Sequence, residues 1–444
     1  MNPKTKKLTI LLSITAIILL VIALIMYAML PCEGEGCNDP VEKNVEIVYW
    51  GIWESDDVMH PLIEKYEFEN PGVKIKYSQQ SFRNYETTVY TRLEQATNSS
   101  EPAPDVVRIH NTWLPKYQRF LTPIPESIMT RETYAEAFYP TAIDDFTGRD
   151  GKLYAIPLHI DGLMVIYNKE IFSKAGYTVP PKDWDAFMEV AKKLTKRDAT
   201  GKITQSGLAI GTSKNIVHSV DILSYFLLQN KVEVMNDARD QVNLTSSRAI
   251  SALDTYTSFV ENEDAATWAV YLPSDLTKFQ NGELAMMFGN SWTALDILEE
   301  APEIKFGLAQ LPRLPNNEEV YYSSYWADAV TSTSKDSTEA WKFVQFLSEE
   351  EQQRRLFENA EKVRFFGQPY SRVSLNSELL NNEYTKAIAV MAPFMKSWQM
   401  GDQSYVENLL KQAITAVVEN NQDSTSVLKK MEKDINIQLA VSNK

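Results

Sequence analysis

Tryptophan and carboxylate side chains are concentrated in the segment YWGIWE, residues 49–54. Trp50 and Trp53 lie three positions apart, and Glu54 follows directly. An aromatic face packs against the apolar C–H face of a sugar ring, and planar polar groups hold its hydroxyl groups in orientation. The segment therefore indicates a binding site for a polar ring, although Trp50, which is still on a predicted strand, could equally pack in the core.

Three further segments combine aromatic and polar side chains in the same way. HNTW contains His110, Asn111 and Trp113, and GNSW places Trp292 after a glycine turn. YYSSYW contains Tyr325 and Trp326. Each segment follows or begins a predicted strand.

Alternating strands and helices must position the first of these segments. We predict strands at 44–50, 73–77 and 105–109, with helices at 58–70 and 85–96 between them. This order implies a parallel sheet with right-handed crossovers. Ligands of such sheets bind beyond the carboxyl ends of the strands, where YWGIWE and HNTW lie.

The segment LYAIPLHIDGLMVIYNKEIF, residues 153–172, leads from this region into a second α/β region. Its sequence and the order of its predicted elements resemble those of family 1 extracellular solute-binding proteins of ABC importers, the group that includes maltose-binding protein. The resemblance covers about residues 45–440. It implies an α/β, two-lobed periplasmic-binding-protein-like fold (type II), with parallel-rich sheets joined by crossing strands.

The resemblance also implies site residues. Asp161 follows the first crossing and would reach the ligand, unless it only ends a strand. Trp292 would stack on the ligand, unless it packs its helix against the sheet. The complete set of expected ligand-binding residues is Trp50, Trp53, Glu54, His110, Asn111, Trp113, Asp161, Trp292, Tyr325 and Trp326.

The predicted lobes are discontinuous in sequence. Residues 44–158 and 325–370 would form lobe 1, and residues 159–324 and 371–444 would form lobe 2. Strands of lobe 2 are expected at 207–210, 284–288 and 304–308. A third crossing is expected near residues 367–372, and helices are expected to follow it.

The N-terminus predicts the compartment. Three lysines precede an uncharged, apolar-rich run at 8–30, which is long enough to span a bilayer. We expect residues 1–31 to be a transmembrane anchor or signal, residues 32–43 to be a tether, and the folded part to be extracytoplasmic. Lipidation at Cys32 remains an alternative, although Pro31 departs from lipoprotein signals, and ordinary cleavage is another. Cys32 and Cys37 could form a local disulfide.

Charge and motifs limit the other functions. The net charge of −15 argues against a nucleic-acid partner. The chain has none of the nucleotide, zinc-protease or serine-hydrolase motifs, so we expect a binding protein that is not an enzyme and has no cofactor. Glu54 and Asp161 facing each other would be the enzyme alternative.

We predict a monomer that captures a carbohydrate, either a mono- or an oligosaccharide, for the permease subunits of an ABC importer. A metal or small amine is an alternative ligand, the metal resting on His110, His159 and Asp161. A surface sensor that keeps the fold without transport is a second alternative.

Overall fold

The computed structural model describes residues 44–99, 102–261, 265–314 and 318–442. The predicted anchor, the tether and both cysteines lie outside these residues. Among the helices of the described part, none is long and apolar enough to cross a membrane.

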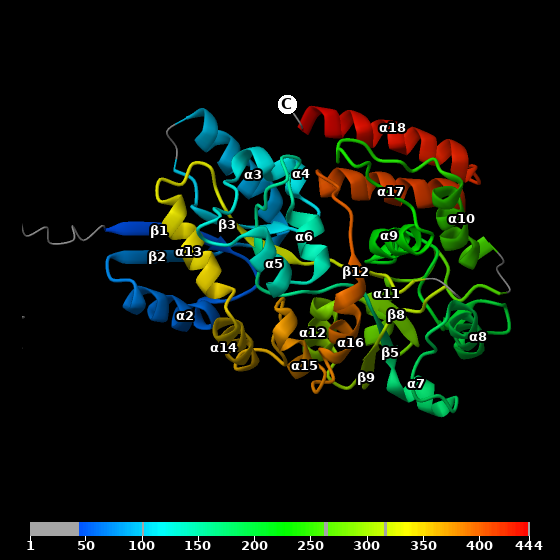
Figure 1. Ribbon diagram of the computed structural model, residues 1–444. Coiled ribbons are helices and arrows are strands. Elements are labelled where there is room, and N and C mark those ends of the chain that lie inside the picture. Colours follow the sequence, from blue (N-terminus) through cyan, green and yellow to red (C-terminus); the bar gives the residue numbers. More distant parts are fainter. Residues whose placement is uncertain (1–43, 100–101, 262–264, 315–317, 443–444) are drawn as a thin grey trace, which may run out of the picture. The chain divides into compact units, whose positions relative to one another are not determined.

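A five-stranded sheet organises the first group of elements, which we call lobe 1 (Figure 1). Its strand order is β2 (Val73–Gln79), β1 (Val45–Gly51), β3 (Val106–His110), β11 (Trp326–Val330) and β4 (Ile156–Pro157). Strand β1 pairs in parallel with β2 and β3, as the predicted strand–helix order requires. Strand β11, which comes much later in the chain, pairs antiparallel with β3 and β4.

A three-stranded sheet organises the second group, lobe 2, in the order β8 (Met286–Gly289), β5 (Met164–Asn168) and β9 (Phe306–Ala309). Both pairings of β5 are antiparallel, so the prediction of a parallel-rich sheet was wrong here. The reason is that β8 and β9 run in one direction, and β5 lies between them in the opposite one. The strand predicted at residues 207–210 is not formed. The preceding residue, Ser206, makes an isolated bridge to Leu284.

Helices cover both sheets. Helices α2 (Asp56–Glu69) and α13 (Ser337–Leu347) pack on lobe 1 (Figure 1). Helices α17 (Gln403–Val418) and α18 (Ser424–Ser442) run side by side next to α10 (Ser247–Glu261) (Figure 1). The other helices are α3 (Tyr85–Asn98), α4 (Leu114–Tyr117), α5 (Arg131–Ala137), α6 (Pro140–Phe146), α7 (Lys169–Lys174), α8 (Trp184–Leu194), α9 (Ser219–Gln229), α11 (Asp275–Gln280), α12 (Ser291–Glu300), α14 (Glu350–Glu361), α15 (Asn376–Leu379) and α16 (Lys386–Met391). Two short strand pairs lie outside the main sheets: β6 (Lys196–Arg197) with β7 (Ile203–Gln205), and β10 (Tyr321–Tyr322) with β12 (Met395–Lys396).

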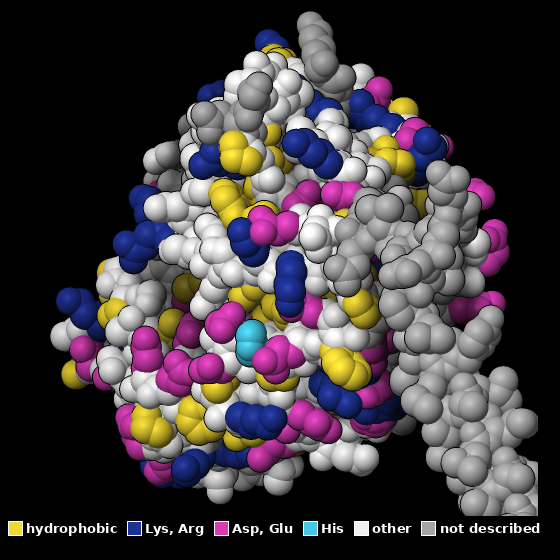
Figure 2. All heavy atoms as spheres, turned by 90° about the vertical axis from the view of Figure 1, so that its left-hand side faces the viewer, with side chains coloured by type: hydrophobic (Ala, Val, Ile, Leu, Met, Phe, Trp, Pro, Cys, Tyr) yellow, Lys and Arg dark blue, Asp and Glu magenta, His cyan; other side chains and the backbone are white. Residues whose placement is uncertain are grey.

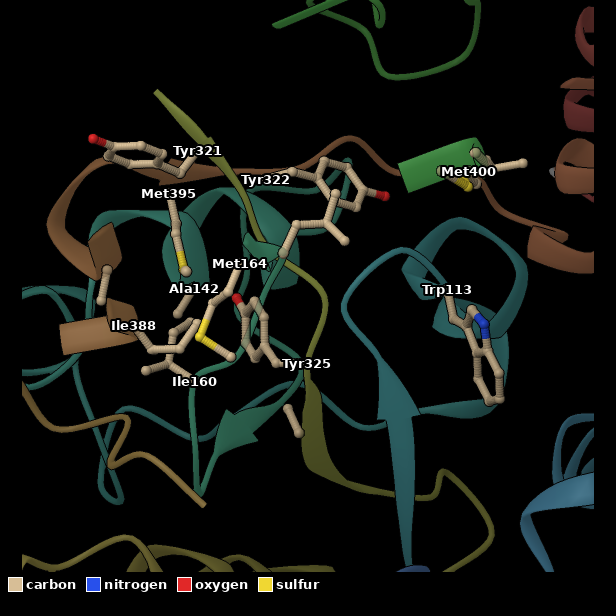
Figure 3. Packing of buried hydrophobic residues seen from close by; sticks show 14 of the residues in the cluster. Trp113, Ala142, Ile160, Met164, Tyr321, Tyr322, Tyr325, Ile388, Met395 and Met400 are labelled. Carbon is tan, nitrogen blue, oxygen red and sulfur yellow. The ribbon is translucent and has the colours of Figure 1, made fainter. Parts of the chain in front are cut away.

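Three segments run side by side between the two sheets. The Ile160 amide donates to the Pro369 carbonyl at 2.9 Å, and the Ser324 amide donates to the Asp161 carbonyl at 3.0 Å. Figure 3 shows Ile160, Met164, Tyr325 and Met395 packed together in this region. The exact lobe boundaries stay a prediction.

A buried ion network lies under the carboxyl end of the first sheet. The Arg108 guanidinium donates to Asp328 at 3.0 Å, to the Tyr49 hydroxyl at 3.0 Å, and to the Glu54 carboxylate. All of these side chains are essentially inaccessible to solvent. Removing one charge would leave its partners buried without compensation.

The outer surface near β2 has mixed charge. Figure 2 shows acidic and basic side chains interspersed on this face. Lys74 pairs with Glu67 at 2.6 Å, and Lys76 pairs with Glu46 at 2.8 Å. Such exposed pairs add little to stability, so the buried Arg108 network is the electrostatic feature that matters for the fold.

Candidate functional site

A cavity of about 620 Å³ lies between residues of lobe 1 and lobe 2. Its size falls in the range that small-molecule sites occupy, roughly 300–1,000 Å³. Seven of the ten predicted residues line it: Trp53, His110, Trp113, Asp161, Trp292, Tyr325 and Trp326. The sequence patterns at strand ends therefore converge on one cavity.

The other three predicted residues lie outside the cavity lining. Trp50 is partly buried and packs against the core. Asn111 is fully buried, and its amide oxygen accepts from the Tyr325 backbone amide at 3.1 Å. Glu54 is occupied by Arg108, and Arg364 lies 3.7 Å from its other carboxylate oxygen. Glu54 is therefore paired with arginine and lies outside the cavity lining to which Asp161 belongs.

Glu54 holds the turn that presents Trp53. Trp53 has φ = +74°, a left-handed conformation that costs a non-glycine residue roughly 1–2 kcal/mol. Its neighbours hold it there, because the Glu54 amide donates to the Ile52 carbonyl at 2.9 Å and the Glu54 side chain is fixed by Arg108. Burial raises the pKa of Glu54, but the positive charges of Arg108 and Arg364 outweigh burial, so the pKa lies below its ordinary value.

Trp53 and Trp292 meet across the cavity. Their rings stack with centroids 4.6 Å apart and an angle of 26° between planes. Phe82 lies 4.3 Å from Trp53, and the Arg364 guanidinium lies 4.8 Å from the Trp292 ring. Because Trp53 follows β1 and Trp292 lies in the first turn of α12, this stack connects the two lobes.

A second aromatic group lies at the end of β3. Trp113 and Trp326 meet edge to face at 4.9 Å, and His110 lies 5.1 Å from Trp326. Burial lowers the pKa of His110 to about 4, so its imidazole is neutral near pH 7. One His110 nitrogen lies 3.1 Å from the Ser324 hydroxyl, and the Trp113 indole donates to Gln403 at 2.7 Å.

Asp161 holds the start of α12. Its carboxylate accepts from the Ser291 hydroxyl at 2.9 Å, the Ser291 amide at 3.1 Å and the Gly162 amide at 2.8 Å. Burial raises the pKa of Asp161 to about 7, outweighing these hydrogen bonds. By holding Ser291, Asp161 positions the next residue of α12, Trp292. Asp161 also lines the cavity.

The raised pKa of Asp161 predicts a pH-dependent stability. In the folded protein the Asp161 carboxyl holds its proton up to about pH 7, whereas in the unfolded chain it releases the proton near pH 4. The stabilisation that protonated Asp161 gives the folded state is therefore complete below about pH 4 and is lost as the pH rises to about 7. Asp161→Asn does not titrate. Between about pH 4 and pH 7, we expect the unfolding free energy of the wild type, relative to that of Asp161→Asn, to fall by about 3–5 kcal/mol.

Urea unfolding of both proteins at about pH 4, 5.5 and 7.5 checks this, since the other buried carboxyls, such as Asp145 with its pKa raised by burial to about 6, are common to both. A difference that stays constant with pH would contradict it.

Several lining residues were missed from the sequence. His218 and Asp221 come from the start of α9, and Gln403 and Glu407 lie one turn apart on α17. Burial, and then the Asp221 charge, raises the pKa of Glu407. No strand end marks these helices in the sequence, so nothing local pointed to them.

Metal ligation finds no support in the described ranges. No group of three or more His, Cys, Asp or Glu residues there could hold a metal ion. His110 instead contacts the hydroxyls of Thr112 and Ser324, and Asp161 contacts Ser291 and Gly162.

Comparison with known proteins gives a consistent family. The family described as bacterial extracellular solute-binding protein matches residues 53–354. The diacetylchitobiose binding protein DasA of Streptomyces coelicolor is 23% identical over an alignment of 449 residues, which covers 94% of this chain and 97% of that protein.

Solved structures agree on the fold. The sugar-binding protein MalE of Xanthomonas citri has a TM-score of 0.71 at 18% identity, covering 89% of this chain and 98% of that one. A cyclo/maltodextrin-binding protein complexed with maltotetraose has a TM-score of 0.72 at 16% identity, covering 92% and 99%. The chain therefore belongs to the bacterial extracellular solute-binding protein family and has its two-lobed type II periplasmic-binding-protein fold.

Proposed function

We propose that this protein captures a carbohydrate in the cavity between its lobes and delivers it to an ABC importer. The observation that carries the proposal is the cavity lining, in which four tryptophans (Trp53, Trp113, Trp292 and Trp326) lie among neutral polar side chains such as His110, Ser324 and Gln403 and acidic ones such as Asp161 and Glu407. Flat indole faces suit the C–H faces of sugar rings, and the polar groups suit hydroxyls. Relatives named for diacetylchitobiose and maltooligosaccharides support the same class of ligand.

The proposed mechanism is closure of the lobes on the ligand. Trp53 and Tyr325 belong to segments of lobe 1 or its return crossing, and Asp161 and Trp292 belong to lobe 2. A ligand that contacts both sets favours the closed arrangement by its extra affinity for it. A permease would then recognise the closed form.

The proposal places the folded part outside the cytoplasm. The family is extracellular, and residues 8–30 form an uncharged run after three lysines. We propose that this run anchors the protein in the membrane, with residues 32–43 as the tether and a single copy as the functional unit. The lobe boundaries at about residues 158, 324 and 370 belong to the same proposal.

A thermal-shift screen of the full-length chain tests the ligand class. The panel contains malto-, chito-, manno- and arabino-oligosaccharides and their monosaccharides, with polyamines, amino acids and divalent metals as controls. A ligand selective for the folded state raises the melting temperature by mass action, and we expect a rise of several degrees with one saccharide class. A rise with an amine or metal, and none with any saccharide, would overturn the proposal.

A further inference from the structure

Unpartnered buried polar atoms are concentrated on one wall of the cavity. In the described part of the chain, several buried side-chain nitrogen or oxygen atoms have no hydrogen-bond partner. Four of them belong to three cavity-lining residues: Nε1 of Trp53, Nδ1 of His159, and both Oε1 and Nε2 of Gln368. Buried polar groups in folded proteins are normally paired, so this concentration requires an explanation.

His159 and Gln368 come from adjacent crossing segments. His159 forms an antiparallel bridge with Tyr370, and the next residue, Ile160, donates its amide to the Pro369 carbonyl at 2.9 Å. The two side chains are 3% and 6% exposed, so neither is a surface group without a fixed environment. The backbone pairing of His159 and Ile160 with Tyr370 and Pro369 fixes the position of the two segments.

This wall lies beside the tryptophan stack. Arg364 is 3.7 Å from Glu54 and 4.8 Å from the Trp292 ring, and the charges of Glu54 and Arg364 both act on His159. Trp292 stacks on Trp53, whose own indole nitrogen is one of the unpartnered atoms. The unpartnered groups and the aromatic faces therefore belong to one part of the cavity.

The wall offers hydrogen-bond donors and acceptors without a free charge of its own. Burial lowers the pKa of His159 to about 3, which leaves a neutral imidazole with one donor and one acceptor nitrogen. The Gln368 amide adds two donor hydrogens and an acceptor oxygen. A pair of neighbouring hydroxyls, each of which both donates and accepts, is complementary to this set.

We propose that His159 and Gln368 form the floor of a subsite that takes two neighbouring hydroxyl groups of one uncharged sugar unit, an assignment that rests on the proposed carbohydrate function. The ring of that unit contacts Trp53 and Trp292, which must separate from their direct stack to admit it. His159 and Gln368 select for the hydroxyl pattern, and the tryptophans recognise the ring.

Two leucine variants separate this role from a structural one. Gln368→Leu removes an amide without partners, whereas Gln353→Leu removes a buried amide that is fully used: its nitrogen donates to Ser371 at 2.7 Å and its oxygen accepts from the Arg372 amide at 3.3 Å. Without saccharide, we expect Gln368→Leu to melt at or above the wild-type temperature and Gln353→Leu to melt several degrees below it. A Gln368→Leu melting temperature as low as that of Gln353→Leu would overturn the assignment.

The binding measurement uses the panel saccharide that gives the largest thermal shift with the full-length wild type. We expect Gln368→Leu and His159→Phe each to bind this saccharide at least tenfold more weakly than the wild type does. We expect an analogue of the saccharide that lacks one of two neighbouring hydroxyls to bind the wild type and both variants with similar affinity. Wild-type affinity in both variants would overturn the subsite and leave the proposed function intact. No saccharide binding by the wild type itself would instead overturn the proposed function and this ligand class with it.

Discussion

Replacing Arg108 with methionine is expected to lower the free energy of unfolding by about 3–5 kcal/mol. Arg108 is 1% exposed and donates to Asp328, to Glu54, to the Tyr49 hydroxyl and to the Ile52 carbonyl. Methionine would leave the buried Asp328 carboxylate without its cation and would leave Glu54 with Arg364 alone, 3.7 Å away. The desolvation of Asp328 is then uncompensated, which is why the loss exceeds that of an ordinary hydrogen bond.

Urea unfolding near pH 7 measures this effect. Lys174→Met is the matched control, because Lys174 pairs with Glu170 at 2.6 Å on an exposed helix surface. We expect no measurable change for the control. Equal unfolding free energies for the two variants would contradict the structural role of the Arg108 network.

The second large effect is on affinity. Trp292→Ala is expected to weaken saccharide binding by about 2–4 kcal/mol, which is roughly 30-fold to 1,000-fold. Trp292 is a partly buried side chain that stacks on Trp53 at 4.6 Å and lies against Arg364. Alanine removes the aromatic face contributed by lobe 2 and leaves the core of that lobe in place.

Trp184→Ala is the control for Trp292→Ala. Trp184 is buried in lobe 2, stacks on Phe226 at 4.8 Å and donates to Gln229 at 2.9 Å, away from the cavity lining. It should lower the melting temperature and leave the affinity of the folded protein unchanged. Unchanged affinity in Trp292→Ala would remove Trp292 from the binding site.

The tryptophans of the site were predictable from the sequence because they lie directly after strand ends. Trp53, Trp113 and Trp292 each follow the end of a strand, and the carboxyl ends of strands meet at one edge of a sheet. Local sequence therefore placed them without knowledge of distant contacts. Glu54 satisfied the same rule, but its partner Arg108 is 54 residues away, and no local pattern shows that pairing.

The polar half of the site depended on long-range packing. Gln368 reaches the cavity because its segment pairs with the one that contains His159, more than 200 residues earlier. Gln403 and Glu407 reach it because α17 packs against α9 and α10. The same limit applied to the fold. Strand–helix order predicted the parallel pairing of β1, whereas the antiparallel insertion of β5 between β8 and β9 depends on strands more than 100 residues further along the chain.

The most direct test of carbohydrate capture is a titration of full-length protein with the same saccharide panel, followed by intrinsic tryptophan fluorescence. Four tryptophans line the cavity, so a ring bound there changes their environment. We predict a saturable change with one saccharide class that is strongly reduced in Trp292→Ala. A saturable change with an amine or metal and none with any saccharide would contradict the account.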